Sequence, residues 1–196
     1  MTFYRRNLPH WHPEGRELFL TWRLHGSLPA GYQQKPKQNG LPGASAGRAF
    51  LGTDRALDRA AAGPVWLKDP SIARCVVDAL NYGQNELKLY ELSAYVIMPN
   101  HLHLLLRPHA PLARITNVLK GYTARMANQI LGRTGKAFWQ DESFDRWVRD
   151  AADSQRIVRY IEWNPVSAGL VDRPENWAWS SAALDLECTG KNACAT

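Results

Sequence analysis

The chain has 196 residues, which is enough for one well-buried domain and short for two. Its content of 45% hydrophobic and 21% charged residues is ordinary for a globular protein, and no apolar run approaches the roughly 18 to 20 residues of a membrane span. The amino-terminal stretch lacks the apolar region of a secretory signal, and the three cysteines form no CxxC pair. We therefore expect a single cytoplasmic domain with neither a zinc knuckle nor a disulfide framework.

The net charge of +6 is concentrated in one segment of the sequence. Residues 92–140 contain no Asp or Glu but six basic residues, which leaves 18 basic and 18 acidic residues in balance elsewhere. Since phosphate contacts supply most of the affinity in nucleic-acid binding, this segment favours a polyanionic partner. A solvated basic face without a ligand is the alternative interpretation.

In chain order, residues 17–24 are rich in β-forming side chains and predict a strand. A Gly- and Pro-rich stretch follows, and we interpret residues 26–64 as an insertion that contains loop and a short helix. Residues 69–86 predict a helix in which Asp69 is the N-cap and Pro70 occupies the first turn.

The second half of the chain predicts a hairpin and two further helices. Its elements are strands at 87–99 and 101–108, a helix at 113–131, a last strand within 137–150, and a helix at 153–163 that ends before Asn164-Pro165. The resulting order is that of an α+β ferredoxin-like βαββαβ unit, an antiparallel sheet with helices on one face, plus a C-terminal helix. We expect this domain to occupy residues 1–183 and residues 184–196 to form a flexible tail.

Two His-x-His pairs occur among only six histidines. His101 and His103 fall in a predicted strand, where residues i and i+2 project from the same face, so the two imidazoles can chelate one divalent ion. His10 and His12 lie between prolines, and we predict no strand that would fix their geometry. Structural histidines are the alternative for His101 and His103, and a terminal loop that packs Trp11 is the alternative for His10 and His12.

Several motifs carry a resemblance to a known family. The stretch "MPNHLHLLL" is followed by a helix with "LKGYTARMANQILGR" and then by "FWQ", "FDR" and "YIEWNPVSAGLV". Together they resemble the single-tyrosine HUH transposases, most closely the REP-associated tyrosine transposases of bacteria. The resemblance extends from about Asn7 to Ser181 and is weakest through the insertion.

The resemblance implies a chemistry for particular residues. His101 and His103 would hold Mg²⁺ or Mn²⁺, and Tyr122 would attack a phosphate of single-stranded DNA to form a 5′-phosphotyrosine intermediate. Packing on the apolar stripe of its own helix is the alternative role for Tyr122, and Tyr160 on the last helix is the second candidate nucleophile.

The third metal ligand is open at this stage. In some relatives it lies one helical turn after the tyrosine, where this chain has Met126, which does not suit a hard cation. We expect Gln129, three residues further along, to be the third ligand. Asp141, Glu142 or water are the alternatives.

Further residues predict contacts with DNA. Basic side chains near the candidate tyrosine and on the last strand could bind phosphate, and an aromatic side chain could stack on a base: Lys120, Arg125, Arg146, Arg149 and Trp139. Surface salt bridges are the alternative role for the last two arginines.

The sequence therefore predicts a metal-dependent single-stranded DNA endonuclease and strand transferase acting at hairpin-forming REP-type sequences, as a monomer or homodimer. A nucleic-acid-binding module of the same fold that has lost cleavage is the first alternative. A metal-dependent hydrolase in which Tyr122 only orients water is the second.

Overall fold

The computed structural model describes residues 2–5, 9–12, 15–28, 53–54, 56–58, 63–141 and 143–183. For residues 2–5 and 9–12 only the backbone is described. Most of the expected insertion and the whole of the expected tail lie outside these ranges, so the predicted domain boundaries stay predictions. Among the residues described, no helix is both long and apolar enough to span a bilayer.

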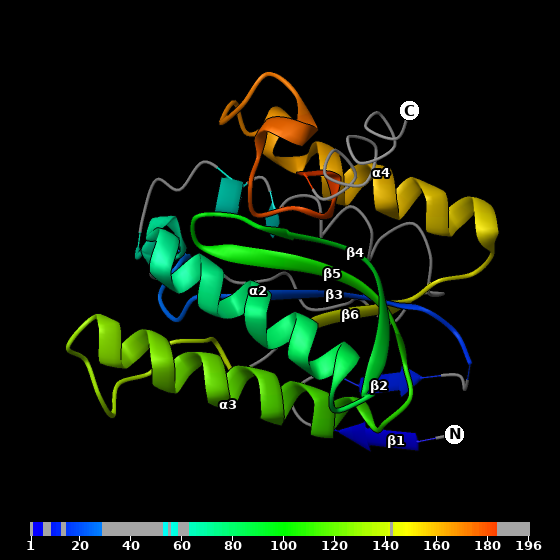
Figure 1. Ribbon diagram of the computed structural model, residues 1–196. Helices are drawn as coiled ribbons and strands as arrows, with labels where there is room; N and C mark the ends of the chain where they lie inside the picture. Colours follow the sequence, from blue (N-terminus) through cyan, green and yellow to red (C-terminus); the bar gives the residue numbers. More distant parts are fainter. Residues whose placement is uncertain are drawn as a thin grey trace, which may run out of the picture.

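The core of the fold is a four-stranded antiparallel sheet (Figure 1). It is built from β3 (Leu18–Arg23), β4 (Tyr90–Ile97), β5 (His101–Pro108) and β6 (Phe144–Trp147), in the spatial order β4-β5-β3-β6. Each neighbouring pair is antiparallel. This arrangement confirms the predicted α+β sheet and its βαββαβ order.

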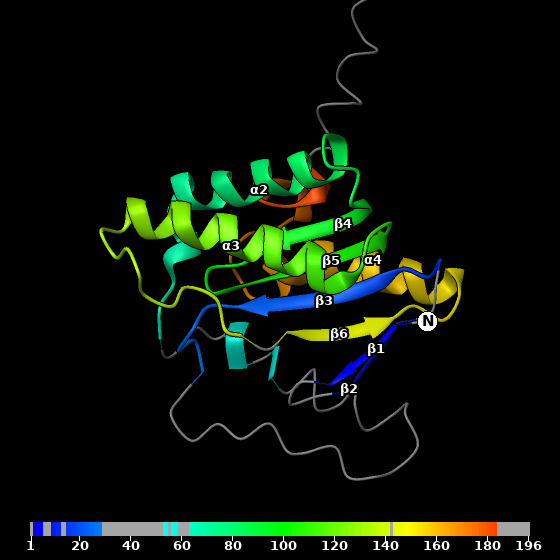
Figure 2. The same cartoon turned by 90° about the horizontal axis from the view of Figure 1, so that it is seen from below.

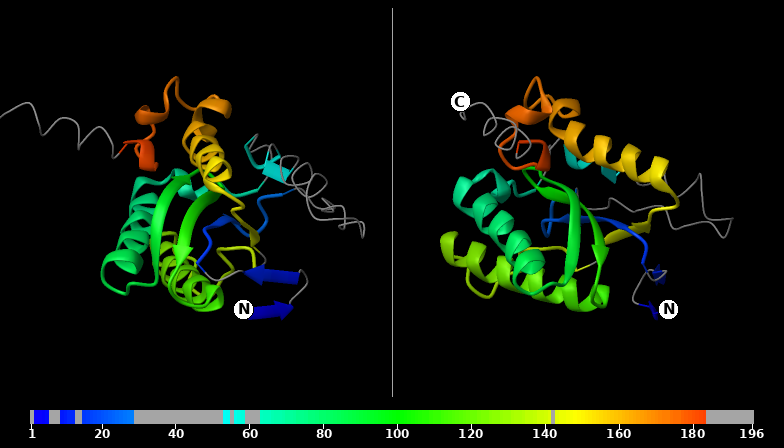
Figure 3. Two further views of the ribbon diagram at one scale, coloured as in Figure 1. Left: turned by 90° about the vertical axis from the view of Figure 1, so that its right-hand side faces the viewer. Right: turned by 45° about the vertical axis from the view of Figure 1, so that its right-hand side comes forward.

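Helices cover both faces of this sheet. The helices α2 (Pro70–Asn85) and α3 (Leu112–Ile130) lie side by side on one face, and α4 (Ala151–Ser167) lies on the other (Figures 2 and 3). The two short 3-10 turns are η1 (Trp66–Lys68) and η2 (Pro174–Asn176). The predicted C-terminal helix is therefore the one that closes the second face.

Alternation along the strands divides the core into two clusters. Leu102, Leu104 and Leu106 of β5 point toward α2 and α3 and are completely buried. Leu105 points the other way and belongs to a second cluster with Ile157 of α4. Because successive residues of a strand alternate between faces, His101 and His103 must lie on the α4 face with Leu105.

The start of α2 follows the sequence prediction closely. The Asp69 side chain accepts a hydrogen bond from the Ser71 amide at 2.8 Å, and Pro70 occupies the first helical position. Such a cap satisfies one of the amides that have no partner inside the helix.

The predicted end of the last helix is wrong, since α4 continues through Asn164 and Pro165 to Ser167. Its C-cap is Ala168, and Gly169 follows with a φ of 70°, which is favourable for glycine. The Leu170 amide donates to the Pro165 carbonyl at 2.9 Å and the Gly169 amide to the Val166 carbonyl at 2.9 Å. Proline removes one amide donor but keeps its carbonyl, so the glycine and not the proline sets the end.

Two strand predictions also need correction. Residues 9–12 form β2 (Pro9–His12), which pairs with β1 (Thr2–Arg5), so a strand does contain His10 and His12. Prolines are compatible with such a two-stranded ribbon because its outer edges need no amide donor. The last sheet strand, β6, covers only part of the range 137–150 from which it was predicted, and within that range Trp139 forms an isolated bridge with Leu24, directly after β3.

Candidate metal centre

The two histidines of β5 form the base of the candidate site. Both side chains are completely buried, and their ring centroids lie 4.8 Å apart. The antiparallel register places them beside Arg23 and Thr21 of β3, in the middle of the sheet rather than at its edge. The structure thus confirms that a strand fixes this pair side by side.

Each imidazole is held through its Nδ1 atom. His101 Nδ1 lies 2.7 Å from Asn100 Oδ1, and His103 Nδ1 lies 2.8 Å from Thr21 Oγ1. With Nδ1 engaged in this way, the Nε2 atoms remain for other ligands, an arrangement typical of metal-binding histidines.

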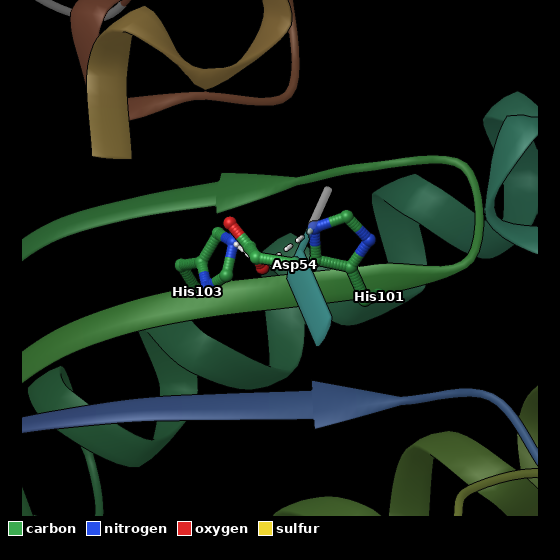
Figure 4. A group of neighbouring side chains, drawn as sticks. All are labelled: Asp54, His101 and His103. Carbon is green, nitrogen blue, oxygen red and sulfur yellow. Dashed lines mark ion pairs between the residues drawn. The ribbon is translucent and has the colours of Figure 1, made fainter. Parts of the chain in front are cut away.

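A carboxylate from the insertion faces the Nε2 atoms. Asp54 Oδ1 lies 3.2 Å from His103 Nε2 and 3.8 Å from His101 Nε2, and Figure 4 shows the carboxylate between the two rings. One ligand atom from each of the three residues falls within 4.8 Å of the others. Nitrogen and oxygen donors at this spacing suit a small divalent cation.

Several buried polar atoms around this point make no hydrogen bond within the described part of the chain. They are Asp54 Oδ1, Asp58 Oδ1, His101 Nε2 and Asn164 Oδ1. Leaving such atoms unsatisfied in a folded protein is costly. All four can donate a lone pair, so a cation fits the set, whereas a further protein donor would satisfy only one of them.

The electrostatics agree with a cation site. Burial is the main cause that lowers the pKa of His101 to about 3, so this imidazole is neutral at physiological pH and has a lone pair to offer. Burial raises the pKa of Asp58 to about 7, and the nearby charge of Asp54 adds to the effect. For Asp54, burial opposes ionisation, but His103, His101 and Asn164 together hold its pKa below the usual value.

Helix α4 brings two further residues to the site. The rings of Tyr160 and His103 have centroids 5.6 Å apart, and Tyr160 also meets Phe19 at 6.1 Å. One turn later, Asn164 Nδ2 lies 3.5 Å from both His103 Nε2 and Asp54 Oδ2. The residue one turn after Tyr160 therefore faces the histidines. A third ligand had been expected at the corresponding position after Tyr122, where the chain has Met126.

The structure does not bring Tyr122 and Gln129 to the histidines. Both lie on exposed positions of α3, which packs on the opposite face of the sheet. The Tyr122 side chain is 44% exposed and lies under the guanidinium of Arg125 at 5.7 Å. Within one chain, the sheet itself therefore separates these residues from His101 and His103.

Two of the expected DNA contacts have structural roles instead. Lys120 Nζ donates to the Gln140 carbonyl and to Ser143 Oγ, both at 2.8 Å, and so ties the segment before β6 to α3. Trp139 is 6% exposed, and its Nε1 donates to Thr123 Oγ1 at 2.9 Å. A buried indole with a satisfied donor is not available to stack on a base.

The arginines beside β6 surround one carboxylate at the start of α4. Arg146 Nη1 lies 2.9 Å from Asp153 Oδ2, Arg149 Nε lies 3.4 Å from it, and Arg156 Nη2 lies 3.5 Å from Asp153 Oδ1. Burial opposes the ionisation of Asp153, but its hydrogen bonds, led by that from Arg146, lower its pKa to about 2. Three guanidinium groups therefore converge on one buried carboxylate, and two further carboxylates, Asp145 and Asp150, lie in the same stretch of the chain.

Sequence reasoning missed Asp54 and Asn164 as site residues. A signal existed for Asn164, because "YIEWN" places it four residues after Tyr160, which is one helical turn. The signal for Asp54 was weaker: Asp54 and Asp58 are four residues apart, which is one helical turn, but nothing in the sequence indicated that this turn packs against the histidines.

Comparisons with known proteins agree with the resemblance found in the motifs. Residues 78–164 match the family of IS200-like transposases, and this match confirms the resemblance and supports a transposase function. The matched range includes both histidines of β5 and extends to Asn164. No curated protein matches the chain by sequence.

Solved structures share the fold. A REP-associated tyrosine transposase bound to a REP hairpin matches with a TM-score of 0.54 and 18% sequence identity, over 95% of this chain and 86% of its own. A provisionally assigned transposase from Deinococcus radiodurans R1 matches with a TM-score of 0.42 and 17% identity, over 81% of this chain and 98% of its own. The first of these supports the fold assignment.

Proposed function

We propose that this chain, whose residues 78–164 match the IS200-like transposases, nicks and rejoins single-stranded DNA through a covalent link to Tyr160. The observation that carries the proposal is the position of α4. It places Tyr160 beside His103 and places Asn164 within 3.5 Å of both His103 and Asp54. Within the described part of the chain, Tyr122 lies on the opposite face of the sheet from this set of residues.

The residues fit a divalent cation, and the proposed cofactor is Mg²⁺ or Mn²⁺. We assign Asp54, His101 and His103 as ligands. Asn164 is the proposed fourth ligand, through its amide oxygen once the amide group turns, because its Nδ2 is the atom that now lies 3.5 Å from His103 and Asp54. When bound, the cation would polarise the scissile phosphate and orient it. Carboxylate and amide oxygens suit hard cations of this kind, and imidazole nitrogens are compatible with their binding.

The role of Tyr160 is that of a nucleophile. Its hydroxyl oxygen forms a bond to the phosphorus and releases the phenolic proton, while the bond from phosphorus to the 3′ oxygen breaks and that oxygen gains a proton. The products are a 5′-phosphotyrosine and a free 3′-OH. Attack by a 3′-OH on the phosphotyrosine rejoins the strands. No external energy source is needed, because the phosphorus is linked to tyrosine by an ester bond that replaces the one that was broken.

The partner we propose is single-stranded DNA with a hairpin of the REP type. The structural relative bound to a REP hairpin supports the choice of hairpin DNA. The three arginines that converge on Asp153 support phosphate contacts near the start of α4, the helix that carries Tyr160. Arg125 is a further candidate on α3, where it would contact DNA that extends around the molecule.

Covalent capture tests the proposal. The full chain is incubated with labelled single-stranded hairpin DNA and Mn²⁺, and protein-linked label is sought on a denaturing gel. We expect an adduct with the wild type and with Tyr122→Phe, and none with Tyr160→Phe. Each change removes one hydroxyl and keeps the ring, so the two variants are matched.

Other outcomes would contradict parts of the proposal. An adduct that persists in Tyr160→Phe and disappears in Tyr122→Phe would return the nucleophile to Tyr122, acting on the site of a second copy. DNA binding without an adduct in the wild type would favour the cleavage-deficient binding module. DNA hydrolysis without an adduct would favour the hydrolase.

A further inference from the structure

Asn100 occupies the turn between β4 and β5 and is completely buried. Its side chain makes two hydrogen bonds, one to each half of the candidate metal centre. Nδ2 donates to the Leu57 carbonyl at 2.9 Å, and Oδ1 lies 2.7 Å from His101 Nδ1. The side chain of Asn100 is not itself a candidate ligand, because both of its polar atoms are used in this way.

These two bonds determine the protonation of His101. The Leu57 carbonyl can only accept a hydrogen bond, so the amide nitrogen of Asn100 must face it and the amide oxygen must face the imidazole. That oxygen can only accept, so His101 Nδ1 must carry the proton. His101 Nε2 therefore has its lone pair directed toward Asp54 and Asp58.

The contact of His103 with Thr21 does not have this effect. A hydroxyl group can donate or accept, so the 2.8 Å contact between Thr21 Oγ1 and His103 Nδ1 is compatible with either tautomer. Of the two Nδ1 contacts, the one between His101 and Asn100 is thus the one that dictates a tautomer by itself.

The second bond of Asn100 reaches the insertion. Leu57 lies three residues after Asp54 in the same helical stretch, and its side chain is 1% exposed. Residues three apart in a helix are neighbours, so fixing the Leu57 carbonyl restrains the turn that carries the Asp54 carboxylate. Asn100 therefore connects a strand ligand to a ligand from a distant segment.

We propose that Asn100 is a positioning residue that assembles the metal centre, holding His101 in the tautomer that binds metal through Nε2 while it anchors the turn that carries Asp54. This inference rests on the proposed function for the metal ligands. Its consequence is that loss of Asn100 disorganises two ligands at once without removing either.

Two variants separate the two bonds. Asn100→Leu keeps the approximate size and removes both bonds, whereas Asn100→Asp keeps an acceptor for His101 Nδ1 and loses the donor to Leu57. Asn128→Leu is the matched control, since Asn128 is 5% exposed and its Nδ2 donates to the Lys136 carbonyl at 2.7 Å, on the opposite face of the sheet. A loss caused only by removing a buried amide would also occur in the control.

Nuclear magnetic resonance of ¹⁵N-labelled histidine in the metal-free protein reports the tautomer. We expect His101 to carry its proton on Nδ1 in the wild type, in Asn100→Asp and in Asn128→Leu, and to lose this preference in Asn100→Leu. Amide hydrogen exchange at residues 56–58 should be faster in both Asn100 variants and unchanged in the control. A wild-type His101 protonated on Nε2 would overturn the proposal.

Titration with Mn²⁺ measures the consequence for the site. We expect Asn100→Leu to bind about 10- to 100-fold more weakly than the wild type, as is usual when the hydrogen-bond partner of a ligand is lost. In an Asp54→Asn background, Asn100→Leu should weaken Mn²⁺ binding by a smaller factor, because one of the two ligands that Asn100 positions is already missing. Equal costs in both backgrounds, or wild-type affinity in Asn100→Leu, would overturn the proposal.

Failure of this inference is distinguishable from failure of the proposed function. Absence of a DNA adduct, with tautomer and Mn²⁺ affinities as expected, would count against strand cleavage and support the role of Asn100. A normal adduct at Tyr160, together with wild-type affinity for Mn²⁺ in Asn100→Leu, would support strand cleavage and count against the role of Asn100.

Discussion

Binding of Mn²⁺ to the metal-free protein should raise its stability substantially. Four buried atoms at the site, contributed by Asp54, Asp58, His101 and Asn164, make no hydrogen bond within the described residues. Each such atom costs about 1–3 kcal/mol, so the metal-free site disfavours folding by several kcal/mol. A cation relieves much of this cost in the folded state and finds no preformed site in the unfolded chain.

The size of the effect follows from mass action. At a metal concentration of about 100 times the dissociation constant, binding to the folded state alone adds about 2.7 kcal/mol to the free energy of unfolding. For a protein of this length, that corresponds to a rise in melting temperature of about 5–11 °C. Thermal unfolding followed by circular dichroism, in chelator and then in Mn²⁺, measures it directly.

A matched pair of histidine variants makes the measurement specific. His101→Ala should abolish the rise, whereas His109→Ala should keep it, because His109 is 44% exposed and pairs at the surface with Glu91 at 3.4 Å. An equal rise in both variants would mean that Mn²⁺ binds elsewhere. No rise in the wild type would refute the interpretation of the buried atoms as a cation site.

Three further predictions concern pH, DNA and the anchoring of α3. The pKa of Asp58 is raised to about 7 in the folded protein, so the metal-free protein loses stability as pH rises from about 4, the pKa of Asp in the unfolded chain, through 7. The melting temperature of Asp58→Asn should therefore exceed that of the wild type by a margin that grows between pH 5 and pH 8. A margin that does not change with pH would contradict this. Arg149→Gln should weaken binding to single-stranded DNA and reduce the slope of log affinity against log salt by about 0.7, as for one lost phosphate contact, with an unchanged slope as the contrary result. Lys120→Met should lower the free energy of unfolding by about 1.5–3 kcal/mol, because its charged hydrogen bonds to Gln140 and Ser143 are lost. The same change should leave the salt dependence of DNA binding unchanged. Chemical denaturation measures the stability and the salt titration measures the slope; a variant with unchanged stability and a reduced slope would mean that Lys120 contacts DNA.

The fold was predictable because its signals are local. Alternation in 101–108 predicted the strand and the faces of its side chains, and the Asp69 cap with Pro70 predicted the start of α2. The end of α4 was not predicted, because Pro165 suggests a stop when it is considered alone. Its carbonyl and the following Gly169 form the actual end, and that arrangement depends on residues on both sides of the proline.

The site was only half predictable, for a different physical reason. The histidines come from one strand, so their relation follows from its period of two. Asp54 and Asn164 reach the site through the packing of an insertion and of α4 against the sheet. The spacing of Tyr160 and Asn164 places both on one face of a helix, but it does not say which face of the sheet that helix covers. The choice between Tyr122 and Tyr160 as the proposed nucleophile depends on the same packing. Both tyrosines lie on helices, and only the face of the sheet that each helix covers distinguishes them.

The distribution of charge along the sequence also differs from the distribution of charge in the folded protein. The acid-free segment 92–140 carries the entire net charge, yet its cations lie largely away from the histidine face: Lys120 ties down a loop, Arg125 lies over Tyr122 on α3, and Arg133 stacks on Trp66 at 3.8 Å. The cations nearest the start of α4 come from a stretch whose acidic and basic residues are interspersed. There three arginines converge on the Asp153 carboxylate, a clustering that a count along the chain does not show. An oriented guanidinium cluster held by one buried carboxylate is better suited to phosphate than a longer run of mobile cations, because less side-chain entropy is lost on binding.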